Sequence, residues 1–178
     1  DLTKNLIING KEYISLEEII EKLPDIVSKL LNVKRFTIIH GDMCFANILV
    51  DTNYLFVKLI DPRGSFGKFD IYGDQRYELA KLLHSIEGEY DFIIKDLFEI
   101  RCSGNEILYD LPDGYNDLNI IESFYSVFKD DLMGKYTEVK LIESLLFISM
   151  IPLHVESKKR QLAMLSTGIM LLNEVTDI

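Results

Sequence analysis

Four polar side chains between positions 40 and 61 have the types and spacing needed to handle a phosphate group. His40, Asp42 and Asn47 form the pattern His-x-Asp-x-x-x-x-Asn, and Asp61 follows fourteen residues after Asn47. A carboxylate can take the proton of an attacking hydroxyl, and carboxylate and amide oxygens are ligands for Mg²⁺ that bridges phosphates. The pattern therefore predicts phosphoryl transfer, with ATP and Mg²⁺ as cofactors.

A short β-hairpin is predicted to bring these side chains together. Residues Ile48–Val50 and Leu55–Ile60 are rich in β-branched and aromatic residues, and the turn residues 51–53 separate them. Pairing of the two strands places Asn47 and Asp61 at the open end of the hairpin, a few residues apart across the ladder. This proximity is an expectation from spacing alone.

The first part of the chain is predicted to be mainly helical. Residues Ser15–Glu18 form a capping-box pattern, which indicates a helix from about Leu16. Pro24 is expected to interrupt this helix, and a second helical piece is expected to end near Asn32. The residues Phe36–Ile39 are β-branched and are predicted to form a strand.

Helices are also predicted after the hairpin. Asp74 is placed to cap a helix whose apolar face is formed by residues 79, 82, 83 and 86. Beyond Gly104 the pattern is expected to be helical to the end, with Gly114, Gly134 and Pro152 as interruptions. The predicted helices lie near Leu118 to Phe128, Val139 to Ile151 and Ser157 to Asn173. The predicted fold class is therefore α+β, mainly helical.

The composition is that of one ordinary folded domain without a nucleic-acid or membrane role. The 178 residues are 48% hydrophobic, and 19 Lys and Arg against 29 Asp and Glu give a net charge of -10. This charge opposes extended contact with nucleic-acid phosphates. The apolar stretch Leu145–Met150 is too short for a membrane span. With only Cys44 and Cys102 and no CxxC pair, a reduced, cytoplasmic chain is expected.

The polar motif resembles that of the aminoglycoside phosphotransferase and choline kinase superfamily, small-molecule kinases distantly related to protein kinases. The sequence from His40 to Asp42 is His-Gly-Asp, which matches the usual start of their catalytic loop, and Ile60 before Asp61 matches the usual context of their metal-binding Asp. The resemblance implies that Asp42 is the catalytic base and that His40 braces the loop. It also implies that Asn47 and Asp61 hold Mg²⁺ beside ATP.

The resemblance continues into the next helix. Leu79–Leu82 is similar to the Asp-Leu-Ala helix of the family, with Glu78 at the position of that Asp. Either Glu78 or Asp74 is then expected to anchor the catalytic loop. The Asp-Pro-Arg-Gly sequence and the run 70–85 resemble a bacterial branch linked with cell-surface sugars or capsular polysaccharide.

Two features depart from the family pattern. Residues Met43–Ala46 stand where relatives often have a His-Pro-Gly type of sequence, which puts the substrate-facing side in question. Upstream of His40 the only glycine is Gly10, so the sequence contains neither a Gly-rich loop nor a Val-Ala-Ile-Lys strand. The resemblance therefore implies the carboxy-terminal lobe of a protein-kinase-like fold, with a small catalytic hairpin and without the amino-terminal nucleotide lobe.

This interpretation divides the single domain, residues 1–178, into three parts. Residues 1–35 form a helical lead-in. Residues 36–75 hold the catalytic loop, the hairpin and the metal loop, and residues 76–178 form a helical substrate-binding region. The isolated chain is expected to be inactive without the amino-terminal lobe of the full-length protein.

The expected function is ATP-dependent transfer of a phosphoryl group to a hydroxyl of a sugar, an aminoglycoside or an amino alcohol. The alternative is a non-catalytic kinase-like domain that binds a partner. The absent lobe favours this alternative, and the intact set of Asp42, Asn47 and Asp61 disfavours it. Arg63 is expected either to neutralise phosphate or to pair with a carboxylate such as Asp70.

The remaining conspicuous residues are expected to have structural roles. His84 and His154 have no metal-ligand partners at useful spacing, and Cys44 has no implied base. Aromatic residues near the motif are expected in the core rather than in a sugar platform, namely Tyr72, Tyr77, Tyr90 and Phe92. Acidic residues of the helical region are expected on a solvated face, the alternative being attraction of a cationic substrate, namely Asp130, Asp131, Glu138 and Glu143.

Overall fold

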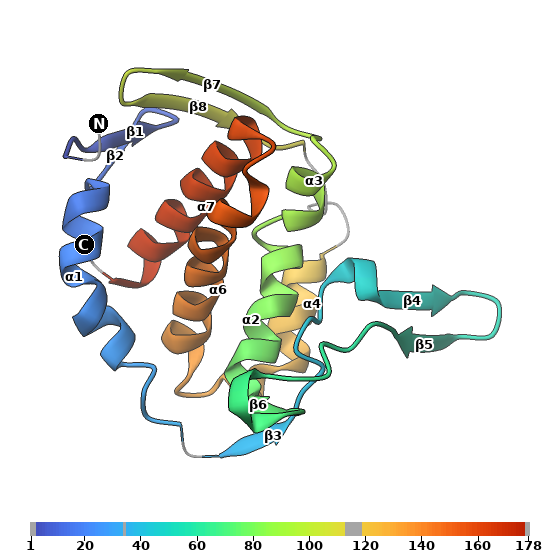
Figure 1. Ribbon diagram of the computed structural model, residues 1–178. Coiled ribbons are helices and arrows are strands. Elements are labelled where there is room, and N and C mark those ends of the chain that lie inside the picture. The colour runs from blue at the N-terminus through green and yellow to red at the C-terminus, as the bar shows by residue number, and fades with distance from the viewer. Residues whose placement is uncertain (1–2, 34, 113–118, 177–178) are drawn as a thin grey trace.

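The computed structural model describes residues 3–33, 35–112 and 119–176. Figure 1 shows a bundle of helices with a sheet over one end and a hairpin that projects from its side. About 51% of the residues are helical, and the sheets are small. The predicted α+β, mainly helical class is therefore confirmed.

Three long helices form the centre of the bundle. Helix α6 (Tyr136–Met150) packs against both α2 (Gln75–Ile86) and α7 (Lys158–Thr176), as Figure 1 shows. Phe147 of α6 is completely buried, as is Leu83 of α2. The short elements around them are α3 (Tyr90–Ile94), α4 (Ile120–Val127), α5 (Lys129–Leu132) and η4 (Ile151–His154).

The helices are those of a globular core. Within residues 3–33, 35–112 and 119–176, none combines the length and the apolar character that crossing a membrane requires. The helix predicted near Leu118 to Phe128 corresponds to α4, which begins at Ile120. Gly114 and Leu118 lie outside the described residues. The other two predicted carboxy-terminal helices correspond to α6 and α7.

A four-stranded sheet covers one end of the bundle, and the sequence analysis did not predict it. Its order is β2 (Lys11–Tyr13), β1 (Leu6–Ile8), β8 (Glu106–Asp110) and β7 (Glu99–Ser103). Neighbouring strands are antiparallel except β1 and β8, which run parallel. The prediction of helix throughout the chain beyond Gly104 is therefore wrong, and the lead-in of residues 1–35, which was predicted to be mainly helical, contains two strands before its helix.

Both missed hairpins carry recognisable local signals, a turn in one and an alternating strand pattern in the other. Asn9 and Gly10 connect β1 to β2 with positive φ angles of 50° and 80°, the conformation that an Asn-Gly hairpin turn requires. In β8, Ile107 and Tyr109 are buried, whereas the residues between and beside them are exposed. This alternation with period two is that of a strand with one face on the core.

The first helix is continuous. Helix α1 (Leu16–Ser28) contains Pro24 in its interior, so the predicted interruption is wrong, and the helix ends before Asn32. The proline lacks the N–H that would reach the carbonyl of Ile20 four residues earlier. The Ile20 side chain is 62% exposed, so this carbonyl lies on the solvent side of the helix, where water can satisfy it. The predicted cap is present, because Ser15 Oγ accepts from Glu18 N at 3.2 Å.

The predicted hairpin of two strands on either side of residues 51–53 is confirmed. Strands β4 (Ile48–Asp51) and β5 (Phe56–Leu59) are antiparallel, with Ile48 opposite Leu59. The hairpin projects away from the helices in Figure 1. The predicted strand at residues 36–39 is β3 (Phe36–Ile38), which pairs with β6 (Tyr72–Asp74) beside the start of α2.

Candidate functional site

The open end of the hairpin carries two of the predicted site residues. Ile60 N donates to the carbonyl of Asn47 at 3.0 Å, which continues the ladder by one bond beyond β4 and β5. Asp61 follows directly with a positive φ of 54°, a conformation that turns the chain sharply. Asn47 and Asp61 are therefore neighbours across the ladder, as the spacing predicted.

Glu78 anchors the loop of residues 40–47, which we call the polar loop. Its carboxylate accepts from His40 N at 2.9 Å and from Gly41 N at 2.8 Å. Asp74 instead accepts from Arg76 N at 3.0 Å and caps α2, as predicted. Of the two anchors that the sequence left open, the structure therefore selects Glu78.

His40 joins the polar loop to the hairpin. Its Nε2 lies 2.9 Å from the carbonyl oxygen of Ile60, so this nitrogen carries the proton and donates. Gly41 has a φ of +79°, and a Cβ at this position would lie 2.9 Å from Cβ of Arg63. The backbone of residues 60–63 is thus packed directly against the polar loop, which fits the bracing role predicted for His40.

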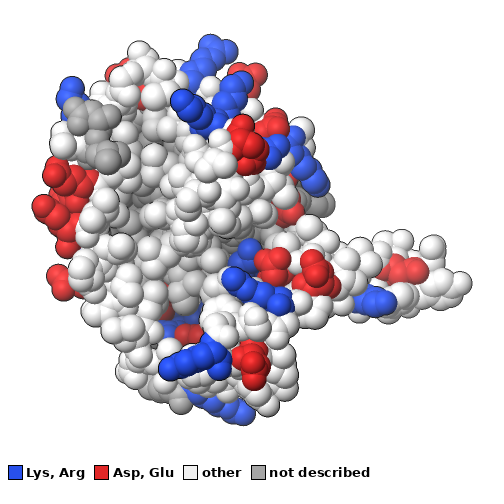
Figure 2. Space-filling model, viewed as in Figure 1, with Lys and Arg blue, Asp and Glu red and all other residues white. Residues whose placement is uncertain are grey.

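Asp42, Asn47 and Asp61 line one cavity of about 590 Å³. Asn47 Nδ2 donates to the backbone oxygen of Asp42 at 2.9 Å and to its Oδ2 at 3.2 Å. Lys81 Nζ lies 2.9 Å from Asp42 Oδ1, so both carboxylate oxygens of Asp42 have a partner. Figure 2 shows side chains of both charges gathered where the projecting hairpin joins the body.

The donor set fits a magnesium ion that is held mainly by phosphates. Because Asn47 Nδ2 donates to Asp42, the Asn47 Oδ1 atom is the one that could act as a ligand, and Asp61 lines the same cavity. Mg²⁺ is usually bound by one or two protein ligands together with water and substrate phosphates. Among the described residues, no group of three or more His, Cys, Asp and Glu side chains forms a metal site by itself.

Lys81 is the site residue that the sequence analysis did not assign. Its side chain is only 7% exposed, whereas that of its partner Asp42 is 43% exposed. The Lys81 ammonium also lies 5.7 Å from the centre of the Tyr90 ring. A signal was present, because Lys81 lies three residues after Glu78 and therefore one turn further along the same face of α2.

Arg63 has no ion pair with Asp70 in the structure. Its Nη1 donates to the hydroxyl of Tyr77 at 3.2 Å, and its guanidinium lies 5.8 Å from the centre of the Phe66 ring. Arg63 also lines the cavity. With the pairing to Asp70 not observed, neutralisation of phosphate is the remaining one of its two predicted roles.

Two aromatic residues predicted as core line the cavity instead, namely Tyr77 and Tyr90. Burial raises the pKa of Tyr90 to about 12, so its hydroxyl stays protonated. Tyr72 is 49% exposed, which also departs from the core prediction. Cys44 is 6% exposed, and burial raises the pKa of its thiol, which fits the predicted packing role.

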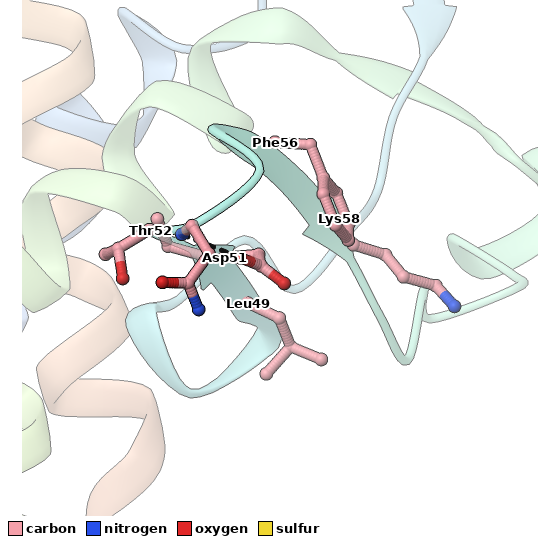
Figure 3. Close-up of a pocket in the computed structure, with 7 residues that line it drawn as sticks. Leu49, Asp51, Thr52, Phe56 and Lys58 are labelled. Carbon is pink, nitrogen blue, oxygen red and sulfur yellow. Dashed lines mark hydrogen bonds between the residues drawn. The ribbon is translucent and has the colours of Figure 1, made fainter.

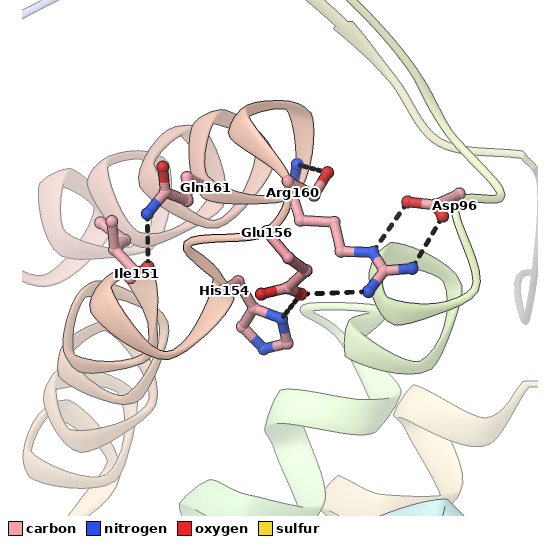
Figure 4. Close-up of polar contacts among 7 residues, drawn as sticks. Asp96, Ile151, His154, Glu156, Arg160 and Gln161 are labelled. Carbon is pink, nitrogen blue, oxygen red and sulfur yellow. Dashed lines mark hydrogen bonds and ion pairs between the residues drawn. The ribbon is translucent and has the colours of Figure 1, made fainter.

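The two other histidines have structural contacts. His84 is completely buried between the rings of Tyr90 and Phe147, and burial together with nearby Lys81 lowers its pKa well below the ordinary value. His154 Nδ1 lies 3.1 Å from Glu156 Oε1 (Figure 4). The predicted packing role is confirmed for His84.

The ion pairs in Figure 4 hold the start of α7 against the segment after α3. Arg160 Nε and Nη2 donate to the two carboxylate oxygens of Asp96 at 2.8 and 2.7 Å. Gln161 Nε2 donates to the carbonyl of Ile151 at 2.9 Å. The bond from Gln161 to Ile151 ties α7 to η4, whose Leu153 lines the cavity.

The acidic residues expected on a solvated face have separate roles. Glu143 is completely buried beside Lys140, with 3.0 Å between Oε2 and Nζ, so the prediction is wrong for this residue. Glu138 pairs with Arg76 at 2.8 Å. Asp131 accepts from Gln75 Nε2 at 3.0 Å. Asp130 is exposed, as predicted.

A second concavity lies on the hairpin itself. It has a volume of about 400 Å³ and is lined by residues that include Leu49, Phe56 and Lys58 (Figure 3). The carboxylate of Asp51 accepts from the backbone N–H groups of Asn53 and Tyr54, so it stabilises the turn. This concavity contains none of the predicted site residues.

Comparisons of the chain with protein-family models, with curated proteins and with solved structures found no match. The assignment of function therefore rests on the residues and geometry described above.

Proposed function

We propose that the protein is an ATP-dependent phosphotransferase that moves a phosphoryl group to a hydroxyl of a small molecule. The observation that carries the proposal is the placement of Asp42, Asn47 and Asp61 on the wall of one cavity. The proposal includes the view that the chain is the carboxy-terminal lobe of a protein-kinase-like fold. It also includes the family resemblance of the motif that begins at His40.

Asp42 is the group that receives the acceptor's proton. Its side chain is 43% exposed and lines the cavity, so an acceptor hydroxyl there can reach its carboxylate. The two contacts hold the carboxylate in one orientation before substrate arrives, and such positioning lowers the entropy cost of the reaction. Glu78 and His40 hold the backbone of the same loop.

The charges of the phosphates are matched by two further groups. When bound, Mg²⁺ would be held by Asn47 and Asp61 and would neutralise phosphate oxygens. Arg63 lines the same cavity and has no carboxylate partner among the described residues, so its guanidinium is available to a phosphate. Catalysis in this scheme is mostly positioning and electrostatic stabilisation.

A second candidate function is a non-catalytic domain that binds a partner. The hairpin favours it, because this projecting element exposes many apolar side chains. They are Leu49, Val50, Tyr54, Leu55, Phe56, Val57 and Leu59. Exposed apolar patches of this kind mark interaction sites in many proteins.

The deciding experiment compares phosphate transfer from ATP by full-length protein with that by Asp42→Asn, over a panel of alcohols. Loss of a general base lowers the rate by about 10²- to 10⁴-fold, and we expect a loss in this range. Asp110→Asn is the matched control, since Asp110 is exposed on β8 and does not line the cavity. Equal activity of wild type and Asp42→Asn would remove Asp42 from its role.

Calorimetric titration of full-length protein with Mg-ATP separates the two functions. The phosphotransferase proposal expects binding that weakens in Asp61→Asn. Absence of binding in the wild type would support the partner-binding domain.

A further inference from the structure

The part of the cavity wall formed by the carboxy-terminal helices is apolar. Ile94 of α3, Leu146 and Met150 of α6 and Leu153 of η4 line it. Leu146 is buried and Leu153 is 70% exposed, so apolar surface runs from the interior of the cavity to the outside of the molecule. The acceptor that reaches Asp42 must lie beside this wall.

The polar groups of the cavity leave little to recognise a cation. Its described lining contains two carboxylates, Asp42 and Asp61, and both already have assigned roles. It also contains two cationic side chains, those of Arg63 and Lys81. Ser149 adds a hydroxyl, but its Oγ donates to the carbonyl of Leu146 at 2.9 Å.

These features discriminate between the acceptor classes on physical grounds. An ammonium group that leaves water must find a carboxylate or an aromatic face, or it loses hydration energy. The Tyr90 ring already has the Lys81 ammonium beside it, and the Tyr77 hydroxyl accepts from Arg63, so a cation at either ring would meet the repulsion of a lysine or an arginine. An apolar group gains free energy by covering apolar wall. The wall therefore favours acceptors without positive charge.

We propose that the acceptor is an uncharged hydroxyl compound that carries an apolar portion, and that the apolar portion lies against Ile94, Leu146, Met150 and Leu153. This inference rests on the proposed phosphotransferase function. It separates the neutral, sugar-like acceptors from aminoglycosides and amino alcohols.

Binding to the full-length protein tests the proposal without ATP. The probes are phenyl β-D-glucoside, glucose, kanamycin and choline, each titrated calorimetrically. We expect phenyl β-D-glucoside to bind at least tenfold more tightly than glucose, and the two cations to bind more weakly than either. Tighter binding of kanamycin or choline, or no advantage from the phenyl group, would overturn the proposal.

A charge variant tests whether the wall is the cause. Met150→Asp places a carboxylate in the apolar wall, and we expect it to weaken phenyl β-D-glucoside binding at least tenfold and to strengthen choline binding. Val155→Asp is the control, because Val155 is 76% exposed and does not line the cavity. Equal effects of the two variants would show that the wall does not select the acceptor.

The outcome is separable from that of the proposed function. If transfer depends on Asp42 but kanamycin is the best acceptor, the acceptor inference fails and the phosphotransferase stands. If phenyl β-D-glucoside binds as expected and no Asp42-dependent transfer to any alcohol occurs, the cavity preference stands and the phosphotransferase fails.

Discussion

Two buried lysines, one at the polar loop and one in the helical bundle, form ion pairs with opposite consequences. Lys81 of α2 is 7% exposed and pairs with Asp42, which is 43% exposed and lines the cavity. Lys140 of α6 is completely buried and pairs with Glu87, Glu143 and, at 3.8 Å, Glu174, of which Glu143 is also completely buried. The two pairs thus differ in that Asp42 and Lys81 line the cavity, whereas Lys140, Glu87 and Glu143 do not.

The pKa values of two groups in the cluster of Lys140, Glu87 and Glu143 are shifted. Burial raises the pKa of Glu143 to about 8, so this carboxyl keeps its proton at neutral pH. Burial works to lower the pKa of Lys140, but the carboxylates of Glu143 and Glu87 outweigh it and raise that pKa overall. Lys140 therefore remains charged and is balanced mainly by Glu87, which also accepts from Tyr125.

Removal of the cation from the enclosed cluster has the largest expected effect. We expect Lys140→Met to lower the free energy of unfolding by about 3–5 kcal/mol, because it leaves the largely buried carboxylate of Glu87 without its counter-charge. Urea denaturation followed by circular dichroism measures the change. Lys129→Met at a solvent-side position of α5 is the control. A loss below about 1 kcal/mol would contradict the view that the buried Lys140 balances the charge of Glu87.

The pH dependence of stability follows from the proton on Glu143. Its pKa is higher in the folded state, about 8, than the ordinary 4.5, so the folded protein holds one more proton between these values. The stabilisation is complete below about pH 4.5 and is lost as pH rises through about 8, with a slope of about 1.4 kcal/mol per pH unit in between. Denaturation of wild type and Glu143→Gln from pH 5 to pH 9 measures it. The wild type should lose stability relative to the variant as pH rises, and parallel curves would contradict this proton assignment.

Removal of the cation at the cavity is expected to affect turnover more than folding. Asp42 can be hydrated when Lys81 is absent, so we expect Lys81→Met to cost less than about 1 kcal/mol of stability. In full-length protein we expect kcat to fall about 10- to 100-fold, with little change in KM for ATP, because Asp42 loses its fixed orientation. Lys81→Arg should restore part of kcat. If Lys81→Met destabilises the fold as strongly as Lys140→Met, the contrast between the two lysines is wrong.

Loosening of the loop anchor has a smaller expected effect on stability than removal of Lys140. Glu78→Gln keeps one acceptor oxygen but turns an amide donor toward the N–H groups of His40 or Gly41. We expect a loss of about 1–2 kcal/mol of stability, which thermal denaturation measures. Glu21→Gln on the exposed side of α1 is the control. An unchanged unfolding midpoint for Glu78→Gln would show that the anchor is dispensable.

Local sequence was sufficient for the polar loop and its hairpin. The strands around Asn47 and Asp61 are joined by a short turn, so their composition and spacing specify which residues meet. The cap at Asp74 and the helix after it were predicted for the same reason, since capping involves neighbouring residues. The hairpins at Asn9-Gly10 and Gly104-Asn105 carried equally local signals that the helical interpretation overlooked.

Other features depended on the folded chain as a whole. The parallel pairing of β1 with β8 joins Ile7 to Glu106, and no turn links those positions. Lys81 forms its ion pair with Asp42 only because α2 packs against the polar loop. The types and order of Asp42, Asn47 and Asp61 were readable from the sequence by itself, because their neighbours along the chain place them. Which lysine faces a cavity and which is sealed inside the bundle was decided by tertiary packing, because the access of water to a charge depends on residues distant in sequence.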